Sequence, residues 1–385
     1  MKKAFVTTRG AKRVRAGHLW IYKSDLQKTD AAGGDVVTVF DEAKNPVGQA
    51  FYSDSSEIAL RFFTTGNETV DREFWRAKLR AAARRRPPNA GTNARRLVNS
   101  EGDLIPSLTV DDYNGVFVIQ TLAQGTEKLK EVFVDLLCEE FSPTAVVERN
   151  DVKVRLLEKL PLQTGVLAGA PPDEIVIEQD GVKFFVTPLA GQKTGSFLDQ
   201  RENHRAVRDY AFGRALDCFT FNGGFALNLA RVCERVTALD ISDEAVALGR
   251  RNAELNELKN VEFETANVFD ALRDYEKAGA RFDTIVLDPP AFVKNRKALH
   301  AAVRGYREIN LRALKLLNQD GILVTCSCSF HFTEELFLDT LQQALRDARR
   351  RAHLVEKRMQ AKDHPVLLGM PETHYLKCFI LRVVE

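Results

Sequence analysis

The segment FDTIVLDPPAFVK, which runs from Phe282 to Lys294, decides the fold. Its apolar core, Thr284 to Leu287, predicts a buried β-strand that stops at Asp288. Because Pro289 has no backbone N–H, the hydrogen-bond ladder of a sheet must end there. The segment therefore predicts a carboxylate on a stiff turn at the C-terminal edge of a strand, where open α/β sheets bind ligands. Such a turn alone is more often a solvated strand exit, so its meaning depends on the flanking sequence.

The flanking sequence alternates between strand and helix patterns from about residue 187 onward. Strands are expected at ALDCF (215–219), VTALDI (236–241), VEFETA (261–266), DTIVLD (283–288) and GILVTCSC (321–328). Helical periodicity fills 224–233, 243–256 and 302–317. The runs AHLVEKRM (352–359) and HYLKCFILRVV (374–384) suggest an antiparallel pair. This alternation predicts an α/β fold with a mostly parallel, doubly wound sheet that ends in an antiparallel pair.

The N-terminal half divides into two further predicted domains, so the expected domains are 1–70, 71–186 and 187–385. Residues 1–70 contain short strands separated by turn residues, which predicts a small β-rich unit. The segment DREFWRAKLRAAARR (71–85) predicts a helix that stops at Pro87, and it would link two domains. Residues 95–186 mix strands with one helix from Thr126 to Phe141, and Asp180-Gly181 predicts a hairpin turn. The polar run 148–151 fits either a substrate cleft or a domain-interface network.

Composition narrows the class of protein. The 385 residues are 44% hydrophobic and 28% charged, which describes an ordinary globular chain of two or three domains. No apolar run is long enough to span a bilayer, and the N-terminus lacks the apolar core of a signal peptide. The six cysteines follow no disulfide or zinc spacing, so we expect no metal and a cytoplasmic location. Residues 1–30 carry eight Lys or Arg against two Asp, which suits a phosphate-binding surface or a solvated face.

Three further strand ends carry the pattern of a nucleotide-type pocket. The first strand ends at Asp217 and leads into Gly223-Gly224, which permit a sharp turn but lack the G-x-G-x-x-G spacing of dinucleotide binders. The second strand ends at Asp240, which can accept both ribose hydroxyls. The third is followed by Asn267, whose amide suits an adenine edge. A ribose and adenine without a pyrophosphate loop indicate S-adenosylmethionine as the cofactor.

The motifs in order resemble one known family. GQKTGSFLDQREN, LDCFTFNGGFAL, ALDIS, ANVFDAL, LDPPAF and TCSCSFH follow one another, and the pieces of residues 1–70 resemble an RNA-binding PUA β-barrel. Together they resemble the class I methyltransferases that modify cytosine C5 in large-subunit ribosomal RNA and carry an N-terminal PUA domain. The resemblance implies a Rossmann-like catalytic domain, a central α+β domain and 5-methylcytosine in 23S ribosomal RNA as the product. Asn222 stands where Thr is usual, and Ser107 where Gly is usual.

Methylation of cytosine C5 calls for a thiolate that adds to C6, because C5 alone is a poor nucleophile. The segment GILVTCSCS supplies Cys326 and Cys328, which would point the same way in an extended chain. Cys328 lies nearer the strand tip and aligns with the nucleophile of pyrimidine-C5 RNA methyltransferases, so it is preferred over Cys326. Both could instead be small buried hydrophobes. Asp288 is expected to bind the cytosine N3/N4 edge or to move a proton.

The remaining expectations concern cofactor and RNA contacts. The residues expected to hold the cofactor are Asp217, Phe219, Asn222, Gly223, Asp240, Ile241, Asn267, Val268, Phe269, Asp288, Gln200 and Arg201. The residues expected to contact substrate are Phe292, Lys294, Pro289 and Arg13, with Phe292 either stacking on the extruded base or covering the pocket. The expected partners are 23S ribosomal RNA, naked or in an assembling subunit, and a second copy of the chain in a homodimer.

Two other functions compete with cytosine methylation. A guanine N-methyltransferase of ribosomal RNA would share the domain pattern but would need no cysteine. A non-catalytic RNA-binding assembly factor would need neither the cysteines nor the acidic strand ends. Retention of Asp217, Asp240, Asp288 and the cysteine pair argues against the second alternative.

Overall fold

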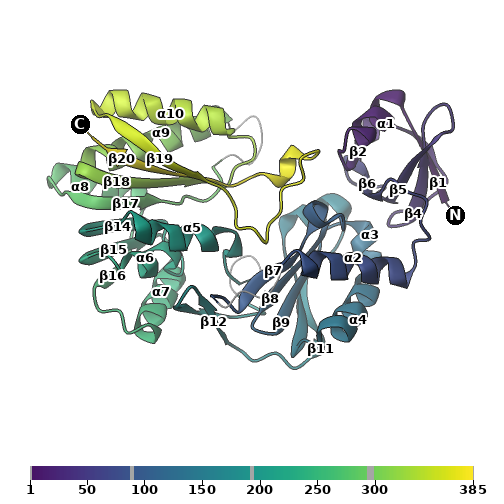
Figure 1. Cartoon of the computed structure of the whole chain (residues 1–385), viewed down its shortest axis with the longest axis horizontal. Helices are drawn as coiled ribbons and strands as arrows, with labels where there is room; N and C mark the ends of the chain where they lie inside the picture. The colour runs from purple at the N-terminus through teal and green to yellow at the C-terminus, as the bar shows by residue number, and fades with distance from the viewer. Residues whose placement is uncertain (1, 87–90, 191–194, 293–298, 385) are drawn as a thin grey trace. The chain divides into compact units, whose positions relative to one another are not determined.

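The structure is a computed structural model that describes residues 2–86, 91–190, 195–292 and 299–384 (Figure 1). The described chain forms two compact units. The first consists of Met1–Ile177, Val186–Leu198 and Lys362–Thr373. The second consists of Glu178–Phe185, Asp199–Ala361 and His374–Glu385. Each unit is therefore assembled from separate stretches of the chain.

The first unit begins with the predicted β-rich segment, which is a six-stranded sheet. Its strands are β1 (Lys2–Val6), β2 (Trp20–Tyr22), β3 (Leu26–Thr29), β4 (Val36–Phe40), β5 (Pro46–Tyr52) and β6 (Ile58–Thr64), in the order β2-β6-β5-β4-β1-β3. Strands β1 and β4 are parallel, and the other pairs are antiparallel. Val37 and Val39, two residues apart on β4, are both fully buried, as the period of two predicts.

A helix that the sequence reading missed lies in the basic N-terminal segment. Helix α1 (Thr8–Arg15) starts at Thr7, whose hydroxyl accepts a hydrogen bond from the Gly10 amide at 3.1 Å. Gly10 and Val14, four residues apart, face the core. The cations gather in the last turn, where they favour the negative end of the helix dipole. High charge hid this amphipathic pattern.

The first unit also contains a five-stranded sheet between residues 94 and 169. Its strands are β7 (Ala94–Asn99), β8 (Leu108–Tyr113), β9 (Val116–Thr121), β10 (Ala145–Asn150) and β11 (Gln163–Gly169), in the order β11-β10-β9-β8-β7. Its helices are α2 (Arg72–Arg84), α3 (Gln124–Lys128) and α4 (Lys130–Phe141), with short 3₁₀ turns at η2 (Ser100–Asp103) and η3 (Lys153–Glu158). Helix α2 packs Trp75 and Leu79 into the core of this sheet, so it is more than a linker. Ser107, where Gly is usual, has a positive φ of 66°.

The predicted hairpin is present as β12 (Ile175–Gln179) and β13 (Val182–Val186). Asp180 and Gly181 have φ values of 51° and 80°. Two successive positive φ values define the type I′ turn that matches the twist of a hairpin. The Asp-Gly prediction is therefore confirmed.

The second unit is built on a seven-stranded sheet, as predicted. The strands are β14 (Arg214–Cys218), β15 (Arg235–Asp240), β16 (Val261–Thr265), β17 (Phe282–Leu287), β18 (Leu317–Ser327), β19 (Ala352–Arg358) and β20 (Lys377–Val383). Their order is β16-β15-β14-β17-β18-β20-β19. The strands from β14 to β18 are parallel, whereas β20 is antiparallel to both β18 and β19. This arrangement confirms the α/β fold with an antiparallel terminal pair.

Strands β14 and β17 mark the point where the order of the sheet reverses. Cys218 is aligned with Leu287, and the Asp288 amide donates to the Cys218 carbonyl at 3.4 Å. The ends of the two strands therefore lie side by side at the C-terminal edge. Open α/β sheets bind ligands at such a switch point.

Helices pack against this sheet. They are α5 (Arg201–Ala206), α6 (Gly224–Leu229), α7 (Asp243–Leu255), α8 (Val268–Lys277), α9 (Leu299–Leu316) and α10 (Glu334–Ala348), with a 3₁₀ turn at η4 (Leu198–Gln200). In Figure 1, α8, α9 and α10 lie beside the strands that run from β17 to β20. Helices α8 and α10 were not predicted, although α10 buries Phe337, Leu341 and Ala344 at helical spacing.

Candidate functional site

The turn between β14 and α6 is the most strained backbone near the sheet edge. Phe219, Phe221 and Gly223 have φ values of 66°, 50° and 91°, and only glycine adopts such values without cost. A Cβ atom added to Gly224 would lie 2.4 Å from the ring of His204, so this position has no room for a side chain. Strain concentrated at one strand end is typical of functional sites.

Asp217, at the end of β14, is a fully buried carboxyl group. Its Oδ2 accepts a hydrogen bond from the Thr220 hydroxyl at 2.6 Å, whereas Oδ1 has no hydrogen-bond partner in the described chain. Burial raises the pKa of Asp217 to about 8, the Thr220 hydroxyl opposes this shift, and the charge of Asp288 adds to it. The side chain therefore carries a proton over much of the neutral range.

Asp240 ends the adjacent strand, β15, and Ile241 follows it. Asp240 uses both oxygens: Oδ2 accepts from the Phe221 amide at 2.9 Å, and Oδ1 accepts from the Ser242 amide at 3.0 Å. The carboxylate thus supports the strained turn and keeps further lone pairs for a ligand. Ile241 is 71% exposed, which is unusual for a large apolar side chain beside a buried strand.

Asn267 follows β16 and caps helix α8. Its side-chain oxygen accepts a hydrogen bond from the Phe269 amide at 2.9 Å, so its amide NH₂ group remains to face outward. Val268 is buried in the core, and Phe269 is half-buried. Asn222, in the glycine turn, is also buried, and its Nδ2 has no hydrogen-bond partner in the described chain.

Gln200 and Arg201 lie where η4 meets α5. Both are buried, and the Gln200 Oε1 accepts from Asn203 Nδ2 at 2.6 Å. A hydrogen bond from the Gln200 side chain also favours a lower pKa for the Cys326 thiol. Arg201 forms a loose ion pair with Glu202 at 3.8 Å.

Some residues after β17 lie at the C-terminal edge of the sheet, and others pack against the hydrophobic core. Asp288 is half-buried, and Pro289 is buried. The Phe292 ring lies 4.8 Å from the Tyr306 ring and 6.1 Å from the Phe269 ring, so it belongs to an aromatic cluster over the core. This placement favours the covering role of the two that were expected for Phe292. Lys294 lies outside the described residues, as do Arg296 and Lys297 of the expected basic loop.

The two cysteines of the pair have different surroundings. Cys326 is fully buried on β18 and is aligned with Cys378 on β20. Burial raises the pKa of the Cys326 thiol well above its usual value, Cys378 and the charge of Asp288 add to the effect, and the Gln200 amide opposes it. Cys328 is half-buried and lies just beyond the end of β18 at Ser327. The paired part of β18 therefore ends one residue before Cys328, whereas Cys326 lies within it.

Tyr306 and Lys377 are site residues that the sequence reading did not identify. Tyr306 is buried on α9, stacks on Phe332 with ring centres 4.4 Å apart, and accepts a hydrogen bond from the Ser327 hydroxyl at 3.0 Å. Burial raises the pKa of Tyr306 to about 12, and the charges of Cys328 and Asp288 both contribute. The phenol therefore lies within electrostatic reach of the thiol and the carboxylate.

Lys377 begins β20 and is only 3% exposed. Its Nζ donates to the Ser329 carbonyl at 2.7 Å and to the Tyr375 carbonyl at 3.0 Å. Burial lowers the pKa of Lys377 to about 8, although the negative charges of Cys328 and Glu334 oppose the shift. The sequence signal for this site residue was a lysine inside the largely apolar run HYLKCFILRVV, because lysine is rarely buried without a reason.

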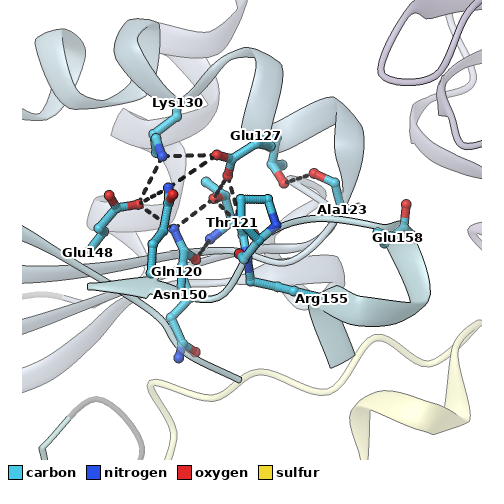
Figure 2. Close-up of polar contacts among 12 residues, drawn as sticks. Gln120, Thr121, Ala123, Glu127, Lys130, Glu148, Asn150, Arg155 and Glu158 are labelled. Atoms are coloured by element: carbon cyan, nitrogen blue, oxygen red, sulfur yellow. Dashed lines mark hydrogen bonds and ion pairs between the residues drawn. The ribbon is translucent and has the colours of Figure 1, made fainter. Parts of the chain in front are cut away.

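Glu148 and Asn150, from the polar run 148–151 of the first unit, belong to a network of hydrogen bonds and ion pairs (Figure 2). Lys130 Nζ lies 3.0 Å from Glu127 Oε1 and 2.9 Å from Glu148 Oε2. Arg155 NH1 lies 2.9 Å from Glu127 Oε2, and Asn150 Nδ2 donates to Glu148 at 2.7 Å. Glu148 and Asn150 therefore have polar partners within the first unit, whereas Arg149 pairs with Asp151 at 3.0 Å and donates to the Ala190 carbonyl at 2.9 Å.

Arg13, the expected RNA contact of the first unit, lies in the last turn of α1. Its guanidinium is 5.2 Å from the centre of the Tyr22 ring, and NH1 has no hydrogen-bond partner in the described chain. Within the described residues, no group of His, Cys, Asp and Glu side chains could hold a metal ion. No helix in the same residues is both long and apolar enough to cross a membrane.

Comparison with known proteins gives consistent matches along the chain. Residues 5–65 match a PUA-like domain, and residues 96–378 match the S-adenosylmethionine-dependent methyltransferase family. The chain is 38% identical over 379 residues to ribosomal RNA large subunit methyltransferase I of Tolumonas auensis, covering 95% of this chain and 96% of that protein. It is 39% identical over 377 residues to the protein of the same name from Pseudoalteromonas atlantica, covering 95% of each.

Solved structures agree on the fold. A putative S-adenosylmethionine-dependent methyltransferase from Streptococcus mutans has a TM-score of 0.86 at 19% identity, covering 99% of this chain and 100% of that chain. A putative methyltransferase complexed with SAH has the same TM-score at 18% identity and the same coverage.

Proposed function

Because the chain belongs to the family of S-adenosylmethionine-dependent methyltransferases and carries a PUA-like domain, we propose that it methylates C5 of a cytosine in 23S ribosomal RNA. Its relatives are named for methylation of large-subunit ribosomal RNA, which supports that RNA as the substrate class. The cytosine and its C5 atom are our own assignment. Naked RNA and an assembling subunit remain alternatives as the form of the substrate. The homodimer and the cytoplasmic location stay predictions.

The residues around the strained turn fit S-adenosylmethionine. Asp217 Oδ1 and Asn222 Nδ2 are buried polar atoms without partners in the described chain, and Gly224 has no space for a side chain. Asp240 would accept the ribose hydroxyls, and the free NH₂ of Asn267 would face the adenine edge. When bound, the cofactor supplies an electrophilic methyl group. The remaining cofactor contacts that we propose are those of the residues predicted from the sequence.

One observation carries the assignment to cytosine C5. Cys328 is a half-buried thiol just beyond the end of β18, and, besides burial, its charge and that of Asp288 both raise the pKa of Tyr306. A thiol and a carboxylate that both act on one phenol near the C-terminal edge of the sheet support a nucleophile and an acidic group in one site. Methylation of a guanine nitrogen would need no such thiol, because the nitrogen lone pair is already nucleophilic.

The proposed chemistry assigns one task to each side chain. The Cys328 thiolate adds to C6 of an extruded cytosine, which gives C5 the electron density that it needs to accept a methyl group. Asp288 holds the N3/N4 edge of the base. After methylation a base removes the C5 proton, and Cys328 leaves as C5 and C6 regain their double bond. Cys326, fully buried and with a raised pKa, is unsuited to the nucleophilic role.

The test is methylation of ribosomal RNA that was isolated from cells lacking the gene. The wild-type chain is expected to form 5-methylcytosine, detected by mass spectrometry of nucleosides. Cys328→Ala is expected to lower the rate by at least about 1,000-fold, whereas the matched Cys326→Ala control keeps most of the activity. Methylguanine formed equally well by Cys328→Ala would replace our proposal with the guanine N-methyltransferase. No methyl transfer to either naked RNA or subunit precursors would favour the assembly factor.

A further inference from the structure

Lys377 is a buried cation that forms no ion pair with an acidic side chain of the described residues. Its Nζ instead donates to two backbone carbonyls, those of Ser329 and Tyr375. A buried ammonium without a close counter-ion is costly, so its position calls for an explanation. The explanation lies in the segment that these contacts surround.

The contacts of Lys377 bracket Cys328. On β18, Ser327 is aligned directly with Lys377 of β20, and Nζ reaches the carbonyl of Ser329 at 2.7 Å. Cys328 is the residue between these two points. The charge of a Cys328 thiolate favours the ammonium form of Lys377, which places the two groups within electrostatic reach.

The hydrogen-bond inventory of Nζ suits a proton acceptor. A neutral amine has two N–H bonds and one lone pair, whereas an ammonium has three N–H bonds. Two N–H bonds satisfy the two carbonyls. The remaining position is a lone pair before protonation and an N–H donor after it, so both states of Lys377 fit the same pair of carbonyls.

We propose that Lys377 accepts the proton of the Cys328 thiol and then holds the resulting thiolate as an ion pair. The S–H bond breaks, its electron pair stays on Sγ, and a new N–H bond forms on Nζ, so the total charge of the pair is unchanged. Lys377 is thus a positioning residue that acts through Cys328. The inference rests on the proposed function, because it takes Cys328 to be the reacting thiol.

The groups that face this pair determine how the proton divides between them. The charge of Glu334, at the start of α10, favours the ammonium form of Lys377. Burial lowers the pKa of His374, which precedes β20, and the charge of Lys377 adds to that shift. Besides burial, the charges of Cys328 and Asp288 both raise the pKa of Tyr306, so this phenol lies within electrostatic reach of the pair. The pKa of Lys377, about 8, lies close to that of an ordinary thiol at about 8.5, so the proton transfer is nearly balanced in energy.

The test measures thiol reactivity on the full chain without RNA or methyl donor. Iodoacetamide alkylation of Cys328 is followed by tandem mass spectrometry, which separates it from Cys326, from about pH 6 to about pH 10. In Lys377→Met the midpoint of the pH profile is expected to rise by about one unit or more, which slows alkylation near neutral pH about 10-fold. Lys377→Arg keeps a permanent cation but cannot accept a proton, so it is expected to stabilise the thiolate through its charge alone.

A matched control separates this effect from the loss of any buried lysine. Burial also lowers the pKa of Lys78 to about 8, and its Nζ donates to the Phe63 carbonyl at 2.7 Å, within the first unit. Lys78→Met is therefore expected to leave the Cys328 profile unchanged. An identical profile in wild type and Lys377→Met would overturn the proposal.

A second measurement covers the case in which Lys377→Met does not fold. The ultraviolet absorbance of the thiolate in wild type, minus that in Cys328→Ser, should titrate below about pH 8.5. A midpoint at or above that value would also overturn the proposal. Since neither readout involves methylation, a shifted profile without 5-methylcytosine would refute the proposed function alone.

Discussion

The network in Figure 2 and the C-terminal edge of the seven-stranded sheet both bury ionisable side chains, but their electrostatics are opposite. In the network, burial alone would raise the pKa of Glu148, yet hydrogen bonds from Lys130, Asn150 and Gln163 outweigh it and lower that pKa. At the sheet edge, burial and like charge raise the pKa of Asp217, and burial lowers that of Lys377.

This difference distinguishes ionisable groups that stabilise the fold from ionisable groups that are available to bind a ligand or react. Paired charges of opposite sign stabilise their own ionised forms and have little left to offer a ligand. Groups held away from their preferred protonation state cost stability and are poised to react or bind. We therefore expect substitutions in the network to alter stability and substitutions at the sheet edge to alter methyl transfer.

After the loss of activity expected for Cys328→Ala, the largest effect on methylation is expected from Asp288→Asn at the sheet edge. Loss of the proposed carboxylate contact to cytosine should lower the single-turnover rate of methylation by about 100-fold or more. Stability in urea should stay equal or increase, because the substitution removes a charge that raises the pKa of Asp217. A variant that was less stable but fully active would break the comparison.

The next effect is expected from Arg155→Met in the network. Arg155 is fully buried, and its removal leaves Glu127 with one cation fewer. Breaking such a buried pair should lower the free energy of unfolding by about 3–5 kcal/mol, measured by urea denaturation. Methyl transfer by the fraction that remains folded should be unchanged. A loss of stability below about 1 kcal/mol would show that the network is dispensable.

The third expected effect is a pH dependence of the free energy of unfolding. Because the pKa of Asp217 is about 8 in the folded chain and ordinary when unfolded, only the folded chain holds this proton between about pH 4 and about pH 8. The contribution of Asp217 to stability should therefore fall as pH rises, by up to about 1.4 kcal/mol per pH unit.

Asp217→Asn should lack this slope. The measurement is the difference in unfolding free energy between wild type and variant across that range, which cancels most other titrations. Parallel pH curves for the two proteins would contradict the assigned protonation of Asp217.

The smallest effect is expected at an exposed ion pair, which calibrates the other three. Lys277 Nζ lies 3.0 Å from Asp274, and both side chains are largely exposed. Lys277→Ala should change the free energy of unfolding by less than about 0.5 kcal/mol and leave methylation unaltered. A change as large as that of Arg155→Met would mean that an exposed ion pair stabilises the fold as much as the buried network does, which would contradict the comparison.

Local rules predicted the features that depend on neighbours in the chain. β17 ended before Pro289, Asp180-Gly181 formed the expected turn, and the acidic residues near the ends of β14 and β15 lie at one sheet edge. The direction of each strand followed from the alternation of strands and helices.

Features that depend on distant partners escaped the sequence reading. Lys377 is far from Cys328 in sequence, and only the antiparallel pairing of β20 with β18 brings them together. The choice between the two thiols likewise depends on where β18 ends, which alternation of side chains alone does not specify. Helix α1 was missed because its apolar residues are few among many cations.

The discontinuous second unit has a consequence for biosynthesis. Strand β20, which carries Lys377, lies between β18 and β19 in the sheet, yet it is translated after both. During translation, a gap must stay open between those strands until the ribosome has released β20, at about 5–20 residues per second. The thiol chemistry that we infer would therefore begin only after β20 has been synthesised and has paired with β18.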